Sequence, residues 1–275
     1  MLATSASMTK STPFISLLLI LSCVMAAGNI AAQTNIAKAE ARPLPLEQLK
    51  AKAESGDAKA QFALGALYHK GDGVGKDRAE ALKWYRKAAE QGYAAAQCEL
   101  GDLCDDGVEA LKWYRKAAEQ GYATGQAVLA INYEHGRGGA AKDYFEAVKW
   151  YRKAAEQGNA QGEVGLATMY KNGHGVAQDY AEAGRWFRKA ANQGSAVGQA
   201  NLGGMYIMGQ GVEKDFVEAY VWLDLAVMSG FGEVGDLHDR VAKHLSEEQL
   251  SKAQKRINQL KAEIAARPAG NETKP

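Results

Sequence analysis

The chain has 275 residues, with 33 Lys and Arg against 32 Asp and Glu and a formal net charge of +1 at pH 7. Lys10 is the single charge among the first 32 residues, so the remainder balances at 32 positive against 32 negative charges. This balance excludes a strong positive field that would gather nucleic acid or anionic lipid, while local patches stay possible.

The N-terminal stretch has an apolar run from Phe14 to Ala27, which is too short for an ordinary transmembrane helix and is typical of a signal peptide. Small residues at 26–28 and 31–32 offer cleavage sites, and Met8 is an alternative start to Met1. We predict a signal peptide over 1–32, a polar linker over 33–44, and a periplasmic or secreted protein without a membrane span after cleavage.

Two alternatives at this end stay open. The first is an uncleaved anchor. The second is lipid attachment through Cys23, because residues 20–23 resemble a bacterial lipobox, although apolar sequence continues past the cysteine. Residues 45–55 follow as a predicted capping helix that begins near Pro45, with Leu46, Leu49 and Ala53 on its apolar face.

A nine-residue segment, Trp84 to Gly92, is repeated along the chain, and its period indicates a solenoid. All five tryptophans occupy its first position, separated by 29, 37, 36 and 36 residues, and a glycine closes every copy. We predict that each repeat buries its one indole. We predict a structural role for these ten residues: Trp84, Trp113, Trp150, Trp186, Trp222, Gly92, Gly121, Gly158, Gly194 and Gly230.

Each copy is preceded by a second apolar pattern of helical spacing, which in the first repeat runs through Ala60, Leu64, Leu67 and Tyr68. The position after Leu64 is always Gly or Ala, so we expect another helix to pass close by. A glycine-rich turn follows in four of the five copies. An Asp with a Glu three residues later then predicts the capped start of the second helix, in a variant of the capping box.

These residues resemble the Sel-one-like repeat family of tetratricopeptide-like α-solenoids. The first repeat carries the family pattern as Ala60, Leu64, Gly65, Tyr68, Gly71, Gly73, Val74, Asp77, Ala81, Trp84, Ala88, Ala89 and Gly92. The resemblance covers residues 56–230 and implies a protein-binding scaffold or adaptor. The disulfide pattern of cysteine-rich relatives is missing here, so no activity of that branch is carried over.

The predicted fold is all-α, a right-handed α-solenoid of five helix-turn-helix repeats with helical caps at both ends. The solenoid spans 45–230, with repeats at 56–91, 92–120, 121–157, 158–193 and 194–229. The C-terminal capping helices span 231–265, with one helix expected from Phe231 to His244 and another from about Ser246. A disordered tail is expected over 266–275.

Two copies depart from the pattern. Copy two lacks the turn glycines, which predicts a shortened first helix and an irregularity at 102–108. Cys98 and Cys104 lie on that helix, and six residues of helix place their Cα atoms about 9 Å apart, beyond disulfide reach. Copy five replaces polar positions of its second helix by Val221, Leu225 and Met228, and we expect the C-terminal helices to cover this face.

The sequence offers no assembled chemistry. His69, His135 and His174 lie near the first turns at unequal offsets and are expected to be exposed turn residues, not a metal site. No catalytic motif is present, and the glycine turns precede an Asp that would repel phosphate. We therefore predict no catalytic, metal or cofactor-binding residues, and we interpret the Lys/Glu pattern on the second helices as a solvated face.

The first helices carry a stripe of residues that does not repeat, while their packing positions do. In this architecture these helices line the concave side, so the stripe is a candidate groove for a protein or peptide partner, with drift at unconstrained sites as the alternative. The candidate partner-binding residues are Lys59, Lys70, Glu99, Asp102, Val128, Ile131, His135, Gln161, Asn172, Asn201 and Met208.

The sequence thus favours an exported, non-catalytic protein-binding scaffold of undetermined oligomeric state. The first alternative is a lipid-anchored assembly factor of an envelope export machine. The second is a cell-wall-modifying hydrolase with an unrecognised site.

Overall fold

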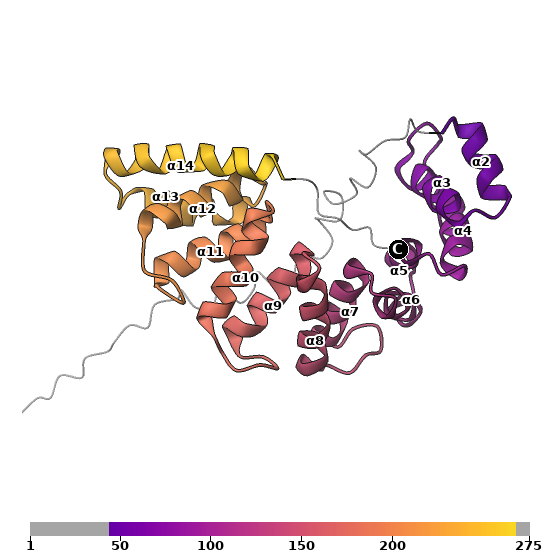
Figure 1. Ribbon diagram of the computed structural model, residues 1–275, viewed down its shortest axis with the longest axis horizontal. Coiled ribbons are helices and arrows are strands. Elements are labelled where there is room, and N and C mark those ends of the chain that lie inside the picture. Colours follow the sequence, from indigo (N-terminus) through magenta and orange to yellow (C-terminus); the bar gives the residue numbers. More distant parts are fainter. Residues whose placement is uncertain (1–43, 268–275) are drawn as a thin grey trace, which may run out of the picture. The chain divides into compact units, whose positions relative to one another are not determined.

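The computed structural model describes residues 44–267, and every regular element in that range is a helix (Figure 1). The expected signal peptide, the lipobox cysteine Cys23, most of the linker and most of the tail lie outside the described residues.

Five helix pairs follow one another, and we call the first helix of each pair the A helix and the second the B helix. The pairs are α3 (Ala58–Lys70) with α4 (Arg78–Glu90), α5 (Ala94–Leu103) with α6 (Gly107–Glu119), α7 (Ala123–His135) with α8 (Tyr144–Glu156), α9 (Ala160–Asn172) with α10 (Tyr180–Asn192), and α11 (Ala196–Met208) with α12 (Phe216–Met228). Helix α2 (Leu46–Glu54) precedes them; a 3₁₀ helix η2 (Gly232–Val234), α13 (Gly235–Ala242) and α14 (Glu247–Ala265) follow.

Neighbouring helices pack in series from α2 to α12, as the ribbon in Figure 1 shows. The A helices of successive repeats also touch, since α5 contacts α7 and α7 contacts α9. The all-helical repeat architecture predicted from the sequence is therefore confirmed.

Each B helix begins at an Asp whose side chain accepts hydrogen bonds from backbone N–H groups of the first turn, as Asp143 does from Phe145 and Glu146 at 2.9 and 3.0 Å. The prediction that the Glu three residues later completes a capping box is wrong. Glu146 instead accepts hydrogen bonds from Lys149 Nζ at 2.9 Å and from the Trp150 indole N–H at 3.1 Å. The indole supplies a buried donor that needs an acceptor, and the Glu one turn earlier satisfies it.

The small residues on the A helices lie where another helix passes close by, as predicted. A side chain of the B helix packs directly over Gly65 and over Gly203. A Cβ added to Gly65 would lie 2.8 Å from Tyr85, and one added to Gly203 would lie 2.8 Å from Leu223. The glycines that follow the B helices all have positive φ, as predicted for the left-handed residue that ends a helix.

The glycine turns between A and B helices rest on the preceding repeat. A Cβ on Gly138 would lie 2.6 Å from the carbonyl oxygen of Gly107, and one on Gly175 or Gly211 would overlap the carbonyl of Tyr144 or Tyr180. Each of these turns thus covers the first turn of the previous B helix. The glycines therefore serve packing between repeats as well as turn geometry.

The five indoles are not equally buried. Trp84, Trp150 and Trp222 are buried, whereas Trp113 and Trp186 are half-buried. The prediction of one buried indole in every repeat is therefore wrong for two of them, whose exposed ring faces lie under a lysine of the same helix.

Repeat two is shortened as predicted. Helix α5 has 10 residues where the other A helices have 13, and Cys98 and Cys104 are thiols, not a disulfide. Arg78 of the preceding repeat spans the missing turn, because its guanidinium donates to the Leu103 carbonyl and to Asp105, each at 2.7 Å.

The C-terminal helices cover the apolar face of repeat five in part. Val221 and Leu225 are buried against Ala253, Ile257 and Leu260 of α14, which confirms the cover. The prediction that Met228 is also covered is wrong, because its side chain remains 54% exposed.

The single helix expected over 231–244 is also wrong, because η2 and α13 divide this stretch. Phe231 and Val234 both point inward. Their spacing of three residues suits a 3₁₀ turn better than an α-helix.

Candidate functional site

The predicted stripe lies on the A helices, and none of its residues is fully buried. Lys59, Lys70, Asp102, Asn172 and Met208 are exposed. The other six stripe residues are half-buried: Glu99, Val128, Ile131, His135, Gln161 and Asn201. The character of the surface changes from acidic on α5 to apolar on α7 and polar on α9.

The structure brings the α5 and α7 parts of the stripe together. The Tyr114 hydroxyl donates a 2.6 Å hydrogen bond to Asp102, and Val128 packs on the small cluster that contains Tyr114. Farther along, Lys171 Nζ donates to Asn201 at 2.9 Å and joins α9 to α11. Lys59 and Met208 lie on the first and last A helices of the series.

The acidic part of the stripe holds protons more tightly than free carboxylates do. Burial, reinforced by the nearby Asp102, raises the pKa of Glu99 to about 7, while Lys70 opposes the shift. Burial also raises the pKa of Asp102, against the hydrogen bond from Tyr114, although one edge of Asp102 remains open to solvent. This surface therefore becomes less negative as the pH falls below 7.

The histidines do not form a site. His135 Nδ1 lies 3.0 Å from the Ile131 carbonyl of its own helix, and His174 stacks on Tyr144 with ring centroids 4.4 Å apart. All three turn histidines are half-buried, so the expectation that they are exposed is wrong. Within residues 44–267, no cluster of three His, Cys, Asp or Glu side chains has a geometry suited to a metal ion.

A polar ladder at the repeat junctions was missed in the sequence. One buried Gln on each of four A helices donates to a carbonyl at the end of the preceding helix, for example Gln97 to Ala89 at 3.1 Å. The residue that follows the B helix of the same repeat then donates to the side chain of this Gln, as Gln120 does to Gln97 at 2.7 Å. The A-helix members are Gln61, Gln97, Gln126, Glu163 and Gln199. A Gln at this fixed position in four copies was the available signal.

A second link crosses the junctions through arginine. The guanidinium of three of the five B helices donates to a tyrosine hydroxyl of the next A helix, as Arg152 does to Tyr170 at 2.9 Å. Arg115–Tyr133 and Arg188–Tyr206 repeat the link at 3.0 and 2.6 Å. Repeat two has Cys104 at the tyrosine position, and Arg86 pairs with Glu109 instead.

On four of the five B helices, a lysine lies over the indole ring of the same helix. Lys189 lies 3.7 Å from the ring centroid of Trp186, and Lys116 lies 4.1 Å from that of Trp113. The sequence led us to interpret these lysines as part of a solvated face. In the structure they also cover the indole ring faces that the core leaves exposed.

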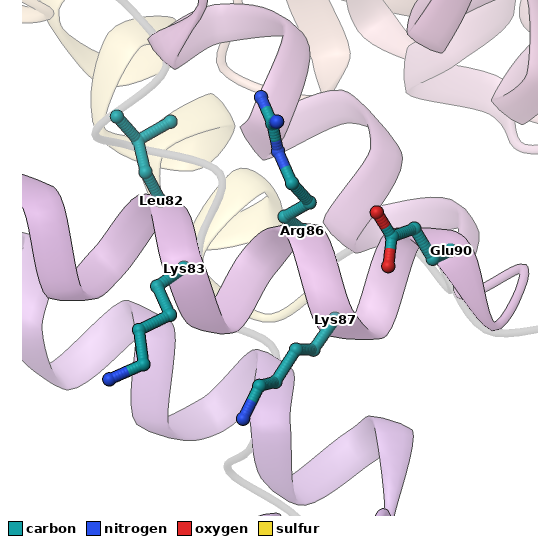
Figure 2. Close-up of a pocket in the computed structure, with 5 residues that line it drawn as sticks. All are labelled: Leu82, Lys83, Arg86, Lys87 and Glu90. Carbon is teal, nitrogen blue, oxygen red and sulfur yellow. The ribbon is translucent and has the colours of Figure 1, made fainter.

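A hollow of about 410 Å³ lies on α4, lined by Leu82, Lys83, Arg86, Lys87 and Glu90. Figure 2 shows these side chains projecting from one helix, with Leu82 and Arg86 on one side and Lys83 and Lys87 on the other. Leu111 and Val148, which occupy the place of Leu82 in the next two repeats, are buried. Leu82 is half-buried because repeat two lacks the turn that would cover it.

A smaller hollow of about 200 Å³ lies between α6 and the turn of repeat three, lined by Val108, Leu111, Lys112, Arg115, Gly138 and Gly139.

Helices stacked in pairs, joined by glycine turns and by a ladder of side-chain amides, define an α-solenoid of two-helix repeats. Within the described residues, no helix is both long enough and apolar enough to cross a membrane.

The model of the Sel1 repeat family matches five consecutive segments, at residues 58–93, 94–122, 123–159, 160–195 and 196–231. The chain therefore belongs to the Sel1 repeat family. Membership in this family of repeat scaffolds supports a role in protein interaction.

Three relatives illustrate the similarity. The structure of c5321, described as a protective antigen of uropathogenic Escherichia coli with an SLR fold, is 37% identical, with a TM-score of 0.72 over 79% of this chain and 48% of that one. A Sel1 repeat protein from Oxalobacter formigenes is 36% identical, with a TM-score of 0.59 over 67% and 78% of the two chains. The secretory immunoglobulin A-binding protein EsiB of Escherichia coli O6:H1 is 56% identical over 43 residues, which are 16% of this chain and 9% of EsiB. The chain thus spans less than half the length of c5321 and of EsiB.

Proposed function

We propose that the protein is a non-catalytic scaffold that binds a protein or peptide partner along the A-helix stripe. The observation that carries the proposal is the contrast between a repeating core and a non-repeating stripe, none of whose residues is fully buried, on A helices of which α5, α7 and α9 contact one another in series. Adjoining helices with different exposed chemistry form an extended surface, and solenoids offer such surfaces to extended ligands.

The relatives support a protein as the class of ligand. EsiB is named for binding secretory immunoglobulin A. That activity belongs to a much longer protein, so only the ligand class is transferred to this chain.

The test compares two variants with the same change in charge. Lys59→Glu with Lys70→Glu alters the stripe, whereas Lys76→Glu with Lys252→Glu alters two exposed lysines outside it. Crosslinked complexes would be purified from the producing cell's envelope and identified by mass spectrometry. We expect a partner whose capture falls at least fivefold in the stripe variant and is unchanged in the control. Equal capture by the wild type and both variants would remove the stripe from the proposal.

We propose further that the protein is exported and released after cleavage near residues 26–32. The support is the apolar run that ends at Ala27. The intact mass of the mature protein distinguishes this from the lipid-anchored alternative. An N-terminus after Ala27, Gly28 or Ala32 is expected, whereas an acylated Cys23 would favour an anchored assembly factor.

A further inference from the structure

Two consecutive B helices carry large apolar side chains that the repeat does not require. The second helical position of the five B helices holds Ala79, Val108, Phe145, Ala181 and Val217. Val108 is 48% exposed and Phe145 is 77% exposed, whereas Val217 packs against the last core cluster. Alanine serves at the same place in repeats one and four, so folding does not explain Val108 and Phe145.

The backbone holds both residues in place. The N–H of Val108 donates to the capping Asp106 at 2.8 Å, and the N–H of Phe145 donates to Asp143 at 2.9 Å. The backbone at a capped helix start is already ordered, so binding at these side chains does not have to order it, which favours their use in binding.

Val108 is one of the residues that line the hollow of about 200 Å³. Its wall is the turn of repeat three, where a Cβ on Gly139 would lie 3.4 Å from Val108. The same connection runs on through the capping Asp143 to Phe145. Pockets for whole small molecules usually exceed about 300 Å³, so this hollow suits one side chain of a larger partner.

The charges around this surface are mainly positive. Lys112 and Arg115 line the hollow, and Arg137 and Lys142 are exposed in the turn. The nearby carboxylates are engaged, since Asp106 and Asp143 cap helices and Glu109 pairs with Arg86. Within residues 44–267, neither Lys112 nor Arg137 has an acidic partner within salt-bridge distance.

We propose that Val108, Leu111 and Phe145, with Lys112 and Arg115, form a docking surface for an acidic protein segment that carries a large apolar side chain. The apolar side chain covers Val108 and enters the hollow that Leu111 also lines, and flanking carboxylates pair with the two cations. This surface lies on the B helices and the turn of repeat three and shares no residue with the A-helix stripe, so it would give the scaffold a place for a second partner.

A library of random twelve-residue peptides displayed on phage, selected on the whole chain, tests the proposal. We expect enriched peptides with an aromatic or large aliphatic residue next to Asp or Glu. Their affinity, measured by fluorescence anisotropy, should fall at least tenfold in Val108→Ala/Phe145→Ala and at least threefold in Lys112→Gln. Higher salt should weaken binding because the flanking charges are exposed.

The double variant copies the alanines of repeats one and four, so it is expected to fold, and circular dichroism checks this. Met228→Ala, which shortens a 54% exposed side chain at the end of α12 and outside both surfaces, is the matched control and should leave affinity unchanged. Peptides that bind the double variant as tightly as the wild type, or that are enriched in Lys and Arg, would overturn the proposal. Concentration-dependent dimerisation of the wild type, lost in the double variant, would also overturn it by making a second copy the occupant.

Discussion

Gln193, at the end of repeat four, donates a 2.7 Å hydrogen bond to the Glu163 carboxylate near the start of the same repeat. Every other junction of the ladder has a Gln where Glu163 stands. The four glutamines donate to a carbonyl eight residues earlier, at Ala53, Ala89, Ala118 and Ala191. A carboxylate has no proton to give there, so only its protonated form can reproduce this bond.

Glu163→Gln is therefore expected to stabilise the protein in a pH-dependent way. Glu163 is 2% exposed, and burial raises its pKa to about 7, against the opposing effects of Lys189 and the Gln193 hydrogen bond. A carboxyl with a raised pKa in the folded state adds no cost below its unfolded pKa, near 4.5. The cost grows as the pH rises towards 7 and is complete above it.

Urea unfolding from pH 4 to pH 8.5 measures this difference. The variant should match the wild type near pH 4 and exceed it by about 1–3 kcal/mol above pH 7, since each pKa unit corresponds to about 1.4 kcal/mol. Gln126→Glu, which places the same carboxyl one junction earlier, should show the opposite change. A difference between Glu163→Gln and the wild type that is constant with pH would contradict the assigned ionisation.

Two turn glycines with nearly the same positive φ should respond very differently to alanine. Gly73 and Gly211 have φ of 70° and 69°. A Cβ on Gly73 would meet no atom within 4 Å, whereas one on Gly211 would overlap the Tyr180 carbonyl of the preceding repeat.

Gly73→Ala should cost about 1–2 kcal/mol, the strain of a left-handed alanine, and Gly211→Ala should cost at least about 3 kcal/mol. Chemical denaturation of both variants gives the comparison, and Gly73→Ala serves as the control for backbone strain. Equal losses would show that the turn does not bear on the previous repeat.

Adjacent glycines in the middle of α11 should have effects of opposite sign. A Cβ on Gly203 would lie 2.8 Å from Leu223, whereas one on Gly204 would meet no atom within 4 Å. Gly204→Ala should stabilise the protein by about 0.5–1 kcal/mol, because alanine restricts the unfolded chain and favours helix.

Gly203→Ala should destabilise it by about 1–3 kcal/mol, because the helix pair must separate or Leu223 must leave its rotamer. Thermal unfolding of the two single variants is sufficient, since they share a helix and a chemical change. If both variants were stabilised, the close approach of α11 and α12 would not be a constraint on this position.

The repeat period, the helix pairs, the Asp caps and the left-handed glycines were all predictable from the sequence. These features depend on hydrogen bonds and side-chain spacing within a few residues, and they recur in several copies. The shortened repeat two and the cover over Val221 and Leu225 were also predictable, because each is a departure from a pattern that the other copies define.

Some details that the structure decided lie within one helix: the indole N–H of Trp150 takes the carboxylate of Glu146 away from the predicted box, and two indoles keep an exposed face under lysines. The others depend on groups that come from different repeats. The raised pKa of Glu163, the hollow at Leu82 and the exposed pair Val108 and Phe145 follow from which repeat lies on which. Local sequence sets the hydrogen bonds within each helix, whereas burial is set by neighbours that are about one repeat away in the chain.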